Sequence, residues 1–203
     1  MNAIIEREAR FVVADPAVHR SVARLTSLGS FRVIRRHRER QRNTYFDTDD
    51  MRLWRAKSVL KLRETCLPRG NRGRQARAVR EMTFKKAISY RDGVSSRLEV
   101  TSRLRPDQRV RMKEGAWSIT PMRRARAIIA TQRLHPLFTV VTDRTTLILS
   151  NNRQRVELDV DRVAVRRGRQ IVARRLEIEV ENLTASPSVF RSAIMALRRR
   201  DGA

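Results

Sequence analysis

Acidic side chains at alternate positions are the first feature of this sequence that could do chemistry. Glu6 and Glu8 are followed at the same spacing by Arg10, and the segment 177–181 has a glutamate at every second position. Alternate side chains of a β-strand project to the same side, roughly 6 to 7 Å apart. Each segment would therefore form a row of like charges, which is repulsive unless something neutralises it. Divalent cations bound through carboxylate oxygens would do so.

Cationic side chains alternate with apolar ones in other segments. Lys61 and Arg63 alternate with Leu60 and Leu62, and Lys85 follows Phe84. A single row of this kind is most often the solvated face of a half-buried sheet. If the sheet closes into a barrel, however, an acidic sector would face a basic one inside it, and the apolar rows would point outward under helices. A triphosphate with bound Mg²⁺ or Mn²⁺ would suit such an interior, because cations would neutralise the phosphates while carboxylates hold the metal.

The elements that would position these rows are mostly strands, so the predicted fold class is a β-rich α+β fold. Capping residues, proline and helical spacing predict helices from Pro16 to before Gly29, over 122–134, and from Pro187 onward. The glycine- and arginine-rich stretch 68–80 lacks periodicity and is interpreted as a long hairpin loop. Alternation predicts strands over residues 4–13, 31–48, 59–63, 81–85, 97–101, 140–149, 155–165 and 171–181.

The charge of the chain predicts a polyanionic partner. Its 203 residues, interpreted as a single domain spanning 1–203, carry a formal net charge of +25. Phosphate chains, nucleic acid and an anionic membrane surface would all be attracted to such a chain, and composition does not choose among them. Nonspecific nucleic acid binding through the basic surface, or through the loop 69–80, is therefore one hypothesis.

Other bulk features predict a soluble protein of the cytoplasm. The lone cysteine, Cys66, excludes an internal disulfide and suits a reducing compartment. The first residues show no secretion signal, and no apolar run is long enough to span a membrane. We expect no membrane partner, and the sequence leaves a homodimer open.

Short motifs follow one another along the chain in a fixed order. They are Glu6-Arg7-Glu8-Ala9-Arg10, Asn43-Thr44-Tyr45-Phe46-Asp47-Thr48, Leu60-Lys61-Leu62-Arg63, Thr83-Phe84-Lys85, Arg97-Leu98-Glu99, Arg144, 157–161 and 177–181. This succession resembles the CYTH superfamily, the triphosphate tunnel metalloenzymes, over nearly the whole chain, and residues 43–48 resemble its inorganic triphosphatase branch. Two positions depart from the family pattern, because Arg10 stands where relatives carry lysine and Thr101 where many carry a second glutamate.

The resemblance implies an eight-stranded antiparallel closed β-barrel, a tunnel in which a triphosphate is hydrolysed with Mg²⁺ or Mn²⁺. It implies three sets of site residues. Glu99 or Glu157 would assist the attacking water as the catalytic residue. The metal ligands would be Glu6, Glu8, Asp161, Glu177 and Glu179, and the phosphate ligands Arg10, Lys61, Arg63, Lys85, Arg97 and Arg144.

Several polar residues have a structural interpretation as well as a functional one. Glu181 and Asp159 could form salt bridges or bind metal. Tyr45 and Asp47 are interpreted as packing and capping residues. The three histidines, at positions 19, 37 and 135, have no ligand spacing and are predicted to lie on the surface.

The sequence leaves three alternatives to inorganic tripolyphosphate hydrolysis. One is a class IV adenylyl cyclase, and a second is a nucleoside or thiamine triphosphatase. Both would need a site for an organic group at the tunnel mouth, and the sequence shows no signature of one. The third is a noncatalytic protein that binds polyphosphate or RNA.

Overall fold

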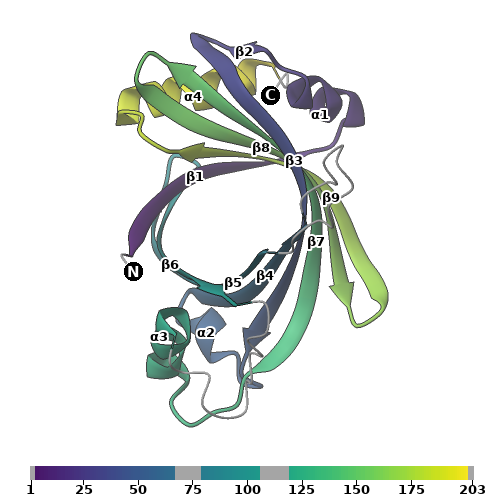
Figure 1. The fold of residues 1–203 in the computed structure, drawn as a ribbon, viewed down its shortest axis with the longest axis vertical. Coiled ribbons are helices and arrows are strands. Elements are labelled where there is room, and N and C mark those ends of the chain that lie inside the picture. The colour runs from purple at the N-terminus through teal and green to yellow at the C-terminus, as the bar shows by residue number, and fades with distance from the viewer. Residues whose placement is uncertain (1–2, 67–78, 106–118, 201–203) are drawn as a thin grey trace.

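Eight antiparallel strands form a closed barrel in the computed structural model, which describes residues 3–66, 79–105 and 119–200. Around the barrel the order is β3-β4-β5-β6-β1-β9-β8-β7, and β7 pairs with β3 to close it (Figure 1). The short strand β2 adds to β3 outside the closed ring. The strands are β1 (Ile4–Val13), β2 (Ser27–Leu28), β3 (Phe31–Asp47), β4 (Ser58–Cys66), β5 (Val79–Arg91), β6 (Val94–Leu104), β7 (His135–Asn151), β8 (Gln154–Arg167) and β9 (Gln170–Asn182).

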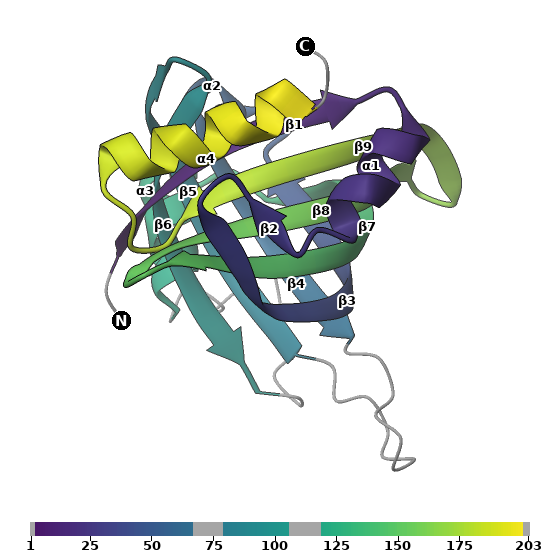
Figure 2. The same ribbon diagram turned by 90° about the horizontal axis from the view of Figure 1, so that it is seen from above.

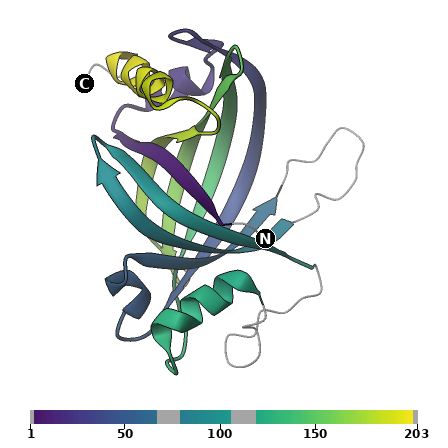
Figure 3. The same cartoon turned by 90° about the vertical axis from the view of Figure 1, so that its left-hand side faces the viewer.

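Helices cover the barrel on two opposite sides. Helices α1 (Pro16–Ala23) and α4 (Pro187–Arg200) pack on one side, and α2 (Arg52–Arg55) and α3 (Thr120–Ile129) on the other (Figures 1 and 3). From above, α1 and α4 lie across β1, β8 and β9 (Figure 2). None of the helices in the described residues covers the part of the outer face of β7, β8 and β9 that lies beyond α1 (Figure 1).

The apolar rows of the strands point outward and build a core under each pair of helices. Leu158, Ile178 and Val180 pack with residues of α1 and α4 in one core. Leu60 and Phe84 pack with residues of α2 and α3 in the other. Because side chains alternate along a strand, this outward burial leaves the charged rows facing into the barrel.

The connections follow local capping chemistry. Asp15 accepts a hydrogen bond from the Ala17 amide at 2.6 Å and caps α1, with Pro16 in its first turn. Asp47 accepts the amides of Leu53 and Trp54, both at 2.9 Å, and so holds α2 against the end of β3. The side chain of Asp47 therefore has the capping role that the sequence indicates.

The structure confirms the predicted fold class and the eight-stranded antiparallel barrel, with some differences at the ends of elements. Strand β2 and helix α2 were not predicted, since two and four residues are too short for a periodic pattern. Helix α3 ends at Ile129 instead of continuing to residue 134, and α1 ends at Ala23. The predicted loop 68–80 lies largely outside the described residues. No helix in the described parts of the chain is long and apolar enough to cross a membrane.

Candidate functional site

All the residues selected as site candidates lie on the inner wall of the barrel. Strand registers place them opposite one another, for example Glu6 opposite Arg97, and Arg144 opposite Asp161. Many are largely withdrawn from solvent, with Glu8 only 4% exposed and Lys61 7%. The inward candidates are Glu6, Glu8, Arg10, Lys61, Arg63, Lys85, Arg97, Glu99, Arg144, Glu157, Asp161, Glu177 and Glu179.

One cluster joins β1, β5 and β6. The Lys85 ammonium lies 2.6 Å from a carboxylate oxygen of Glu6 and 2.8 Å from one of Glu99. Burial lowers the pKa of Lys85, but the two carboxylates outweigh it and raise that pKa. Thr101 donates to Glu99 at 2.9 Å. Burial alone would raise the pKa of Glu99, whereas Lys85 and Thr101 lower it, so Glu99 is held as a charged acceptor.

A second cluster centres on Arg10 and joins β1, β6 and β9. Arg10 lies 2.5 Å from Glu179 and 3.9 Å from Glu177. Arg97 lies 2.8 Å from Glu8, which is also 3.5 Å from Arg10. These carboxylates raise the pKa of Arg10 against the opposing effect of its burial. Arginine at position 10 thus forms ion pairs with the acidic rows of two strands.

A third cluster surrounds Arg144 on β7. Its guanidinium bonds Asp161 at 2.9 and 2.6 Å, Glu179 at 3.1 Å, and also Asp159. Thr146 donates a further hydrogen bond to Asp159 at 2.5 Å. Glu179 contacts both Arg144 and Arg10, so it connects the second and third clusters.

The expectation of an acidic sector facing a basic one is corrected by these contacts. Arg144, predicted for the phosphate side, pairs with Asp161 and Glu179 from the predicted metal side, and Lys85 pairs with Glu6. Cations and carboxylates are therefore interleaved around much of the wall. The physical reason is that opposite charges lower the cost of burying one another when they lie close together, whether on paired strands (Arg144 and Asp161) or on strands one apart (Lys85 and Glu6).

Lys61 differs from the other inner cations. Among the described residues, no hydrogen bond or ion pair is found for its ammonium, although it is almost fully buried. Burial lowers its pKa well below the usual lysine value, and the nearby Arg63 and Lys85 lower it further. Arg63 itself donates to the side-chain oxygen of Asn43 at 3.1 Å. The Lys61 side of the tunnel therefore has positive charge that no neighbouring carboxylate contacts directly.

Carboxylates accumulate near the other predicted catalytic residue, Glu157. It lies opposite Glu181 in the register of β8 and β9, and no ion pair to Glu157 is found among the described residues. Burial and the like charges of Glu6 and Glu157 raise the pKa of Glu181 to about 8. Glu181 and Asp159, which the sequence leaves between structural and functional roles, both belong to the inner wall.

His19 was wrongly predicted to lie on the surface. It is 4% exposed, and its Nε2 lies 3.0 Å from the backbone oxygen of Asp161. Helix α1 packs against β8 and directs His19 inward beside Val22, which is fully buried. Both residues lie on the same face of the helix, so the helical spacing contains a signal for this burial.

The donor chemistry of the inner wall fits a hard divalent cation, although the clusters do not form a ready-made metal site. Carboxylate oxygens are the ligands that Mg²⁺ and Mn²⁺ prefer. Burial and the like charges of Glu6 and Glu157 raise the pKa of Glu181, and a bound cation would oppose both effects. Within residues 3–66, 79–105 and 119–200, however, no three metal-ligating side chains converge on one point. Arg10, Arg97, Arg144 and Lys85 neutralise the candidate ligands, so a metal would have to exchange with these cations.

Comparison with known proteins identifies the family. A family model described as the CYTH domain matches residues 5–200. The chain belongs to the CYTH domain family. A search of curated proteins found no match.

Solved structures share the fold of this CYTH domain at low sequence identity. A Bacillus halodurans protein, described as a candidate adenylate cyclase, is 22% identical with a TM-score of 0.66, over 100% of this chain and 92% of its own. A Hippeastrum candidate adenylyl cyclase, HpAC1, for which a dominant triphosphatase activity is described, is 21% identical with a TM-score of 0.66, over 97% and 88%. Protein PH1819 from Pyrococcus horikoshii is 17% identical with a TM-score of 0.58, over 96% and 89%. These likenesses establish the shared tunnel fold.

Proposed function

We propose that this CYTH domain hydrolyses a triphosphate, inorganic tripolyphosphate, with Mg²⁺ or Mn²⁺ inside the tunnel. The observation that carries the proposal is the buried Lys61 ammonium, which has no counter-ion among the described residues. A buried cation is costly unless it is paired, so this side of the tunnel favours an anion. Phosphoryl oxygens would supply the missing negative charge and accept its hydrogen bonds.

Some of the inner residues would bind the phosphate chain, and others would bind the metal. Lys61, Arg63 and, once released from its carboxylates, Lys85 would hold the phosphate chain and spread its charge. Arg10, Arg97 and Arg144 would contact phosphate when a metal takes over their carboxylate partners. Glu6, Glu8, Asp161, Glu177 and Glu179 would hold the metal, with Asp159 and Glu181 beside them. When bound, the metal would neutralise phosphoryl oxygens and acidify the attacking water.

Proton transfer from the attacking water is assigned to Glu157 rather than to Glu99. Glu99 accepts hydrogen bonds from Lys85 and Thr101, so its oxygens are already engaged. Glu157 faces the tunnel opposite Glu181 and has no ion-pair partner among the described residues. A carboxylate without a cation beside it is the better proton acceptor.

Inorganic tripolyphosphate is proposed over a nucleotide for two reasons. Residues 43–48 resemble the triphosphatase branch, and HpAC1, of the same fold, has a dominant triphosphatase activity described for it. Adenylyl cyclase, nucleoside triphosphatase and thiamine triphosphatase activities would each require an additional site for the organic group.

A noncatalytic triphosphate carrier is the second candidate. The observation that favours it is the pairing of the metal-side carboxylates with arginines, above all Arg144 with Asp159, Asp161 and Glu179. If that pairing persists when a triphosphate binds, the anion would be held without a metal. Binding without turnover would be the result.

A substrate panel separates these candidates. Purified protein is incubated with Mg²⁺ or Mn²⁺ and with tripolyphosphate, ATP or thiamine triphosphate, and released phosphate, pyrophosphate and cyclic AMP are measured. We expect phosphate and pyrophosphate from tripolyphosphate at the highest rate, and none when the metal is chelated. Tight tripolyphosphate binding without turnover would refute hydrolysis and support the carrier. Cyclic AMP from ATP would refute the proposed reaction class.

A further inference from the structure

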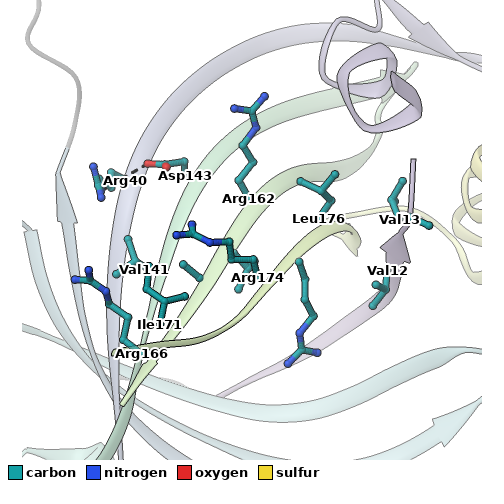
Figure 4. A pocket seen from close by; sticks show the side chains of 14 residues that line it. Val12, Val13, Arg40, Val141, Asp143, Arg162, Arg166, Ile171, Arg174 and Leu176 are labelled. Carbon is teal, nitrogen blue, oxygen red and sulfur yellow. Dashed lines mark ion pairs between the residues drawn. The ribbon is translucent and has the colours of Figure 1, made fainter. Parts of the chain in front are cut away.

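Arginines also lie on the outer face of the barrel wall, the face that points away from the tunnel. Two cross-strand rows run over β3, β7, β8 and β9 on this side. The first row is Arg40, Asp143, Arg162 and Leu176, and the second is Arg42, Val141, Ala164 and Arg174. Arg166 continues the surface at the next position of β8 (Figure 4). We call this surface the outer arginine face.

This face is open and shallowly hollowed. A hollow of about 590 Å³ on this face is lined by Arg40, Arg162, Arg166 and Arg174 and by apolar residues that include Val141, Ile171 and Leu176 (Figure 4). All four arginines are exposed to solvent. A second hollow on the same wall, beside α1, is lined by Arg20, Arg24 and Arg38 together with Arg40 and Arg162. The positive surface therefore extends from β9 across to α1.

The outer arginines are nearly free of neutralising carboxylates. Among the described residues, the one ion pair on this face joins Arg40 to Asp143 at 3.7 Å, and Asp143 is itself 62% exposed. In the described part of the chain, no carboxylate lies within 4 Å of the guanidinium groups of Arg162, Arg166 or Arg174. Exposed guanidinium groups concentrated in this way create a positive potential that attracts polyanions.

We propose that the outer arginine face binds the sugar-phosphate backbone of single-stranded nucleic acid, independently of the tunnel. Arg38, Arg40 and Arg42 alternate along β3, so their side chains repeat about every 7 Å, and the face is roughly 14 Å wide across its four strands. A phosphate chain can follow such rows, because each guanidinium can bond phosphate oxygens bidentately. The apolar floor between the arginines can contact sugars and exposed bases, which a duplex would keep stacked inside.

Two other occupants fit this face less well. A second copy of the chain, using the same surface, would bring arginine rows against arginine rows, which repel. An acidic peptide would be attracted by charge, but carboxylates on flexible side chains do not form the continuous phosphate chain that the rows can follow. No aromatic side chain is found among the described residues that line the hollow, so the contacts would be mainly to phosphate and independent of sequence.

The experiment measures fluorescence anisotropy of a labelled single-stranded RNA of mixed sequence, about 20 nucleotides long. Its 5′ end carries a hydroxyl group, so no terminal triphosphate can enter the tunnel. The test variant combines Arg162→Gln, Arg166→Gln and Arg174→Gln. The matched control combines Arg55→Gln, Arg123→Gln and Arg124→Gln, which removes the same charge from α2 and α3 on another side of the barrel.

We expect the test variant to bind the RNA at least about tenfold more weakly, while the control binds within about threefold of the natural chain. The plot of log binding constant against log salt concentration has a negative slope, and its magnitude should be smaller by about 2 in the test variant. Each lost phosphate contact removes about 0.7 from that magnitude. Tripolyphosphate turnover should be the same in both variants. Equal losses of RNA affinity in the test and control variants would show that net charge alone determines binding, and would overturn the proposal. Displacement of the RNA by polyglutamate at equal charge concentration would overturn the choice of nucleic acid.

Discussion

The two faces of the barrel wall formed by β3, β7, β8 and β9 use arginine in opposite ways. On the inner face, Arg144 is 13% exposed in its side chain and is bonded by three carboxylates. On the outer face, Arg40 is 68% exposed and has one ion pair, at 3.7 Å. The same strands thus carry buried arginine–carboxylate pairs inside and open, largely unpaired arginines outside.

This difference shows what determines the role of an arginine in so basic a chain. Inside the barrel, the cost of removing charge from water favours a carboxylate partner for a guanidinium, and Arg10, Arg97 and Arg144 each have one. Outside, water screens each guanidinium, so no such partner is needed. The inner pairs can be exchanged for metal and phosphate, whereas the outer groups can bind only what comes from solvent.

The largest effect is expected from removing an inner carboxylate. Glu179→Gln should reduce metal-dependent tripolyphosphate turnover about 1000-fold, because Glu179 connects Arg10 and Arg144 and is a proposed metal ligand. The control is Glu64→Gln, since Glu64 is paired with Arg80 at 3.5 Å outside the proposed site. Initial rates with Mg²⁺ and Mn²⁺, together with circular dichroism of each variant, provide the comparison. Similar rates for Glu179→Gln and the natural chain would remove Glu179 from the site.

A large effect on stability is expected from the inner arginine and almost none from an outer one. Arg144→Met should lower the free energy of unfolding by about 3 kcal/mol at pH 7, because it leaves three buried carboxylates without their cation. Arg162→Met on the neighbouring strand should change it by less than about 0.5 kcal/mol. Urea denaturation measures both values. If the two substitutions cost the same, the contrast between the two faces is wrong.

A smaller effect is expected from the pH dependence that Glu181 contributes. Its pKa is raised to about 8 in the folded chain from 4.5, so the folded state holds a proton that the unfolded state has released in this range. Its contribution to stability is therefore complete below about pH 4.5 and is lost as the pH rises through about 8. Because solvent screens Glu181 in part, we expect its contribution to the free energy of unfolding to be about 1 kcal/mol.

Glu181→Gln should remove this dependence. In buffer with a metal chelator at pH 9, the free energy of unfolding of the variant should be about 1 kcal/mol higher than that of the natural chain. At pH 4.5 the two values should differ little. Thermal or urea unfolding at a series of pH values tests it, with Glu64→Gln as the control. An equal pH slope in the variant and the natural chain would show that Glu181 is not the group responsible.

Most of the fold could be predicted from the sequence, because the patterns that specify its strands and helices are local ones. Alternation in eight segments marks eight strands, and Asp15 followed by Pro16 marks the start of α1. The end of α3 was not predictable, because Ala130 terminates it in a left-handed conformation with a φ of 56° where no glycine gives a signal. Strand β2 and helix α2 are too short to repeat a pattern.

The membership of the inner wall was also predictable, but the contacts within it were not. Alternation places Asp159 with Asp161, and Glu181 with Glu179, so all four could have been assigned to one face. Which cation meets which carboxylate depends instead on the register between strands that are distant in the sequence. The pairing of Arg10 with Glu179 requires β1 to align with β9, and no local pattern encodes that alignment.

The most direct test of the tunnel as a triphosphate site is the protonation of Lys61 when tripolyphosphate binds. Burial and the nearby Arg63 and Lys85 lower the pKa of Lys61 in the free protein, and an adjacent phosphate chain should raise it again by stabilising the ammonium. Calorimetric titration with tripolyphosphate in two buffers of different ionisation enthalpy measures the protons taken up. We predict that the natural chain takes up more protons on binding than Lys61→Met does and binds tripolyphosphate about 10- to 100-fold more tightly. Equal proton uptake and equal affinity in the two proteins would contradict the account.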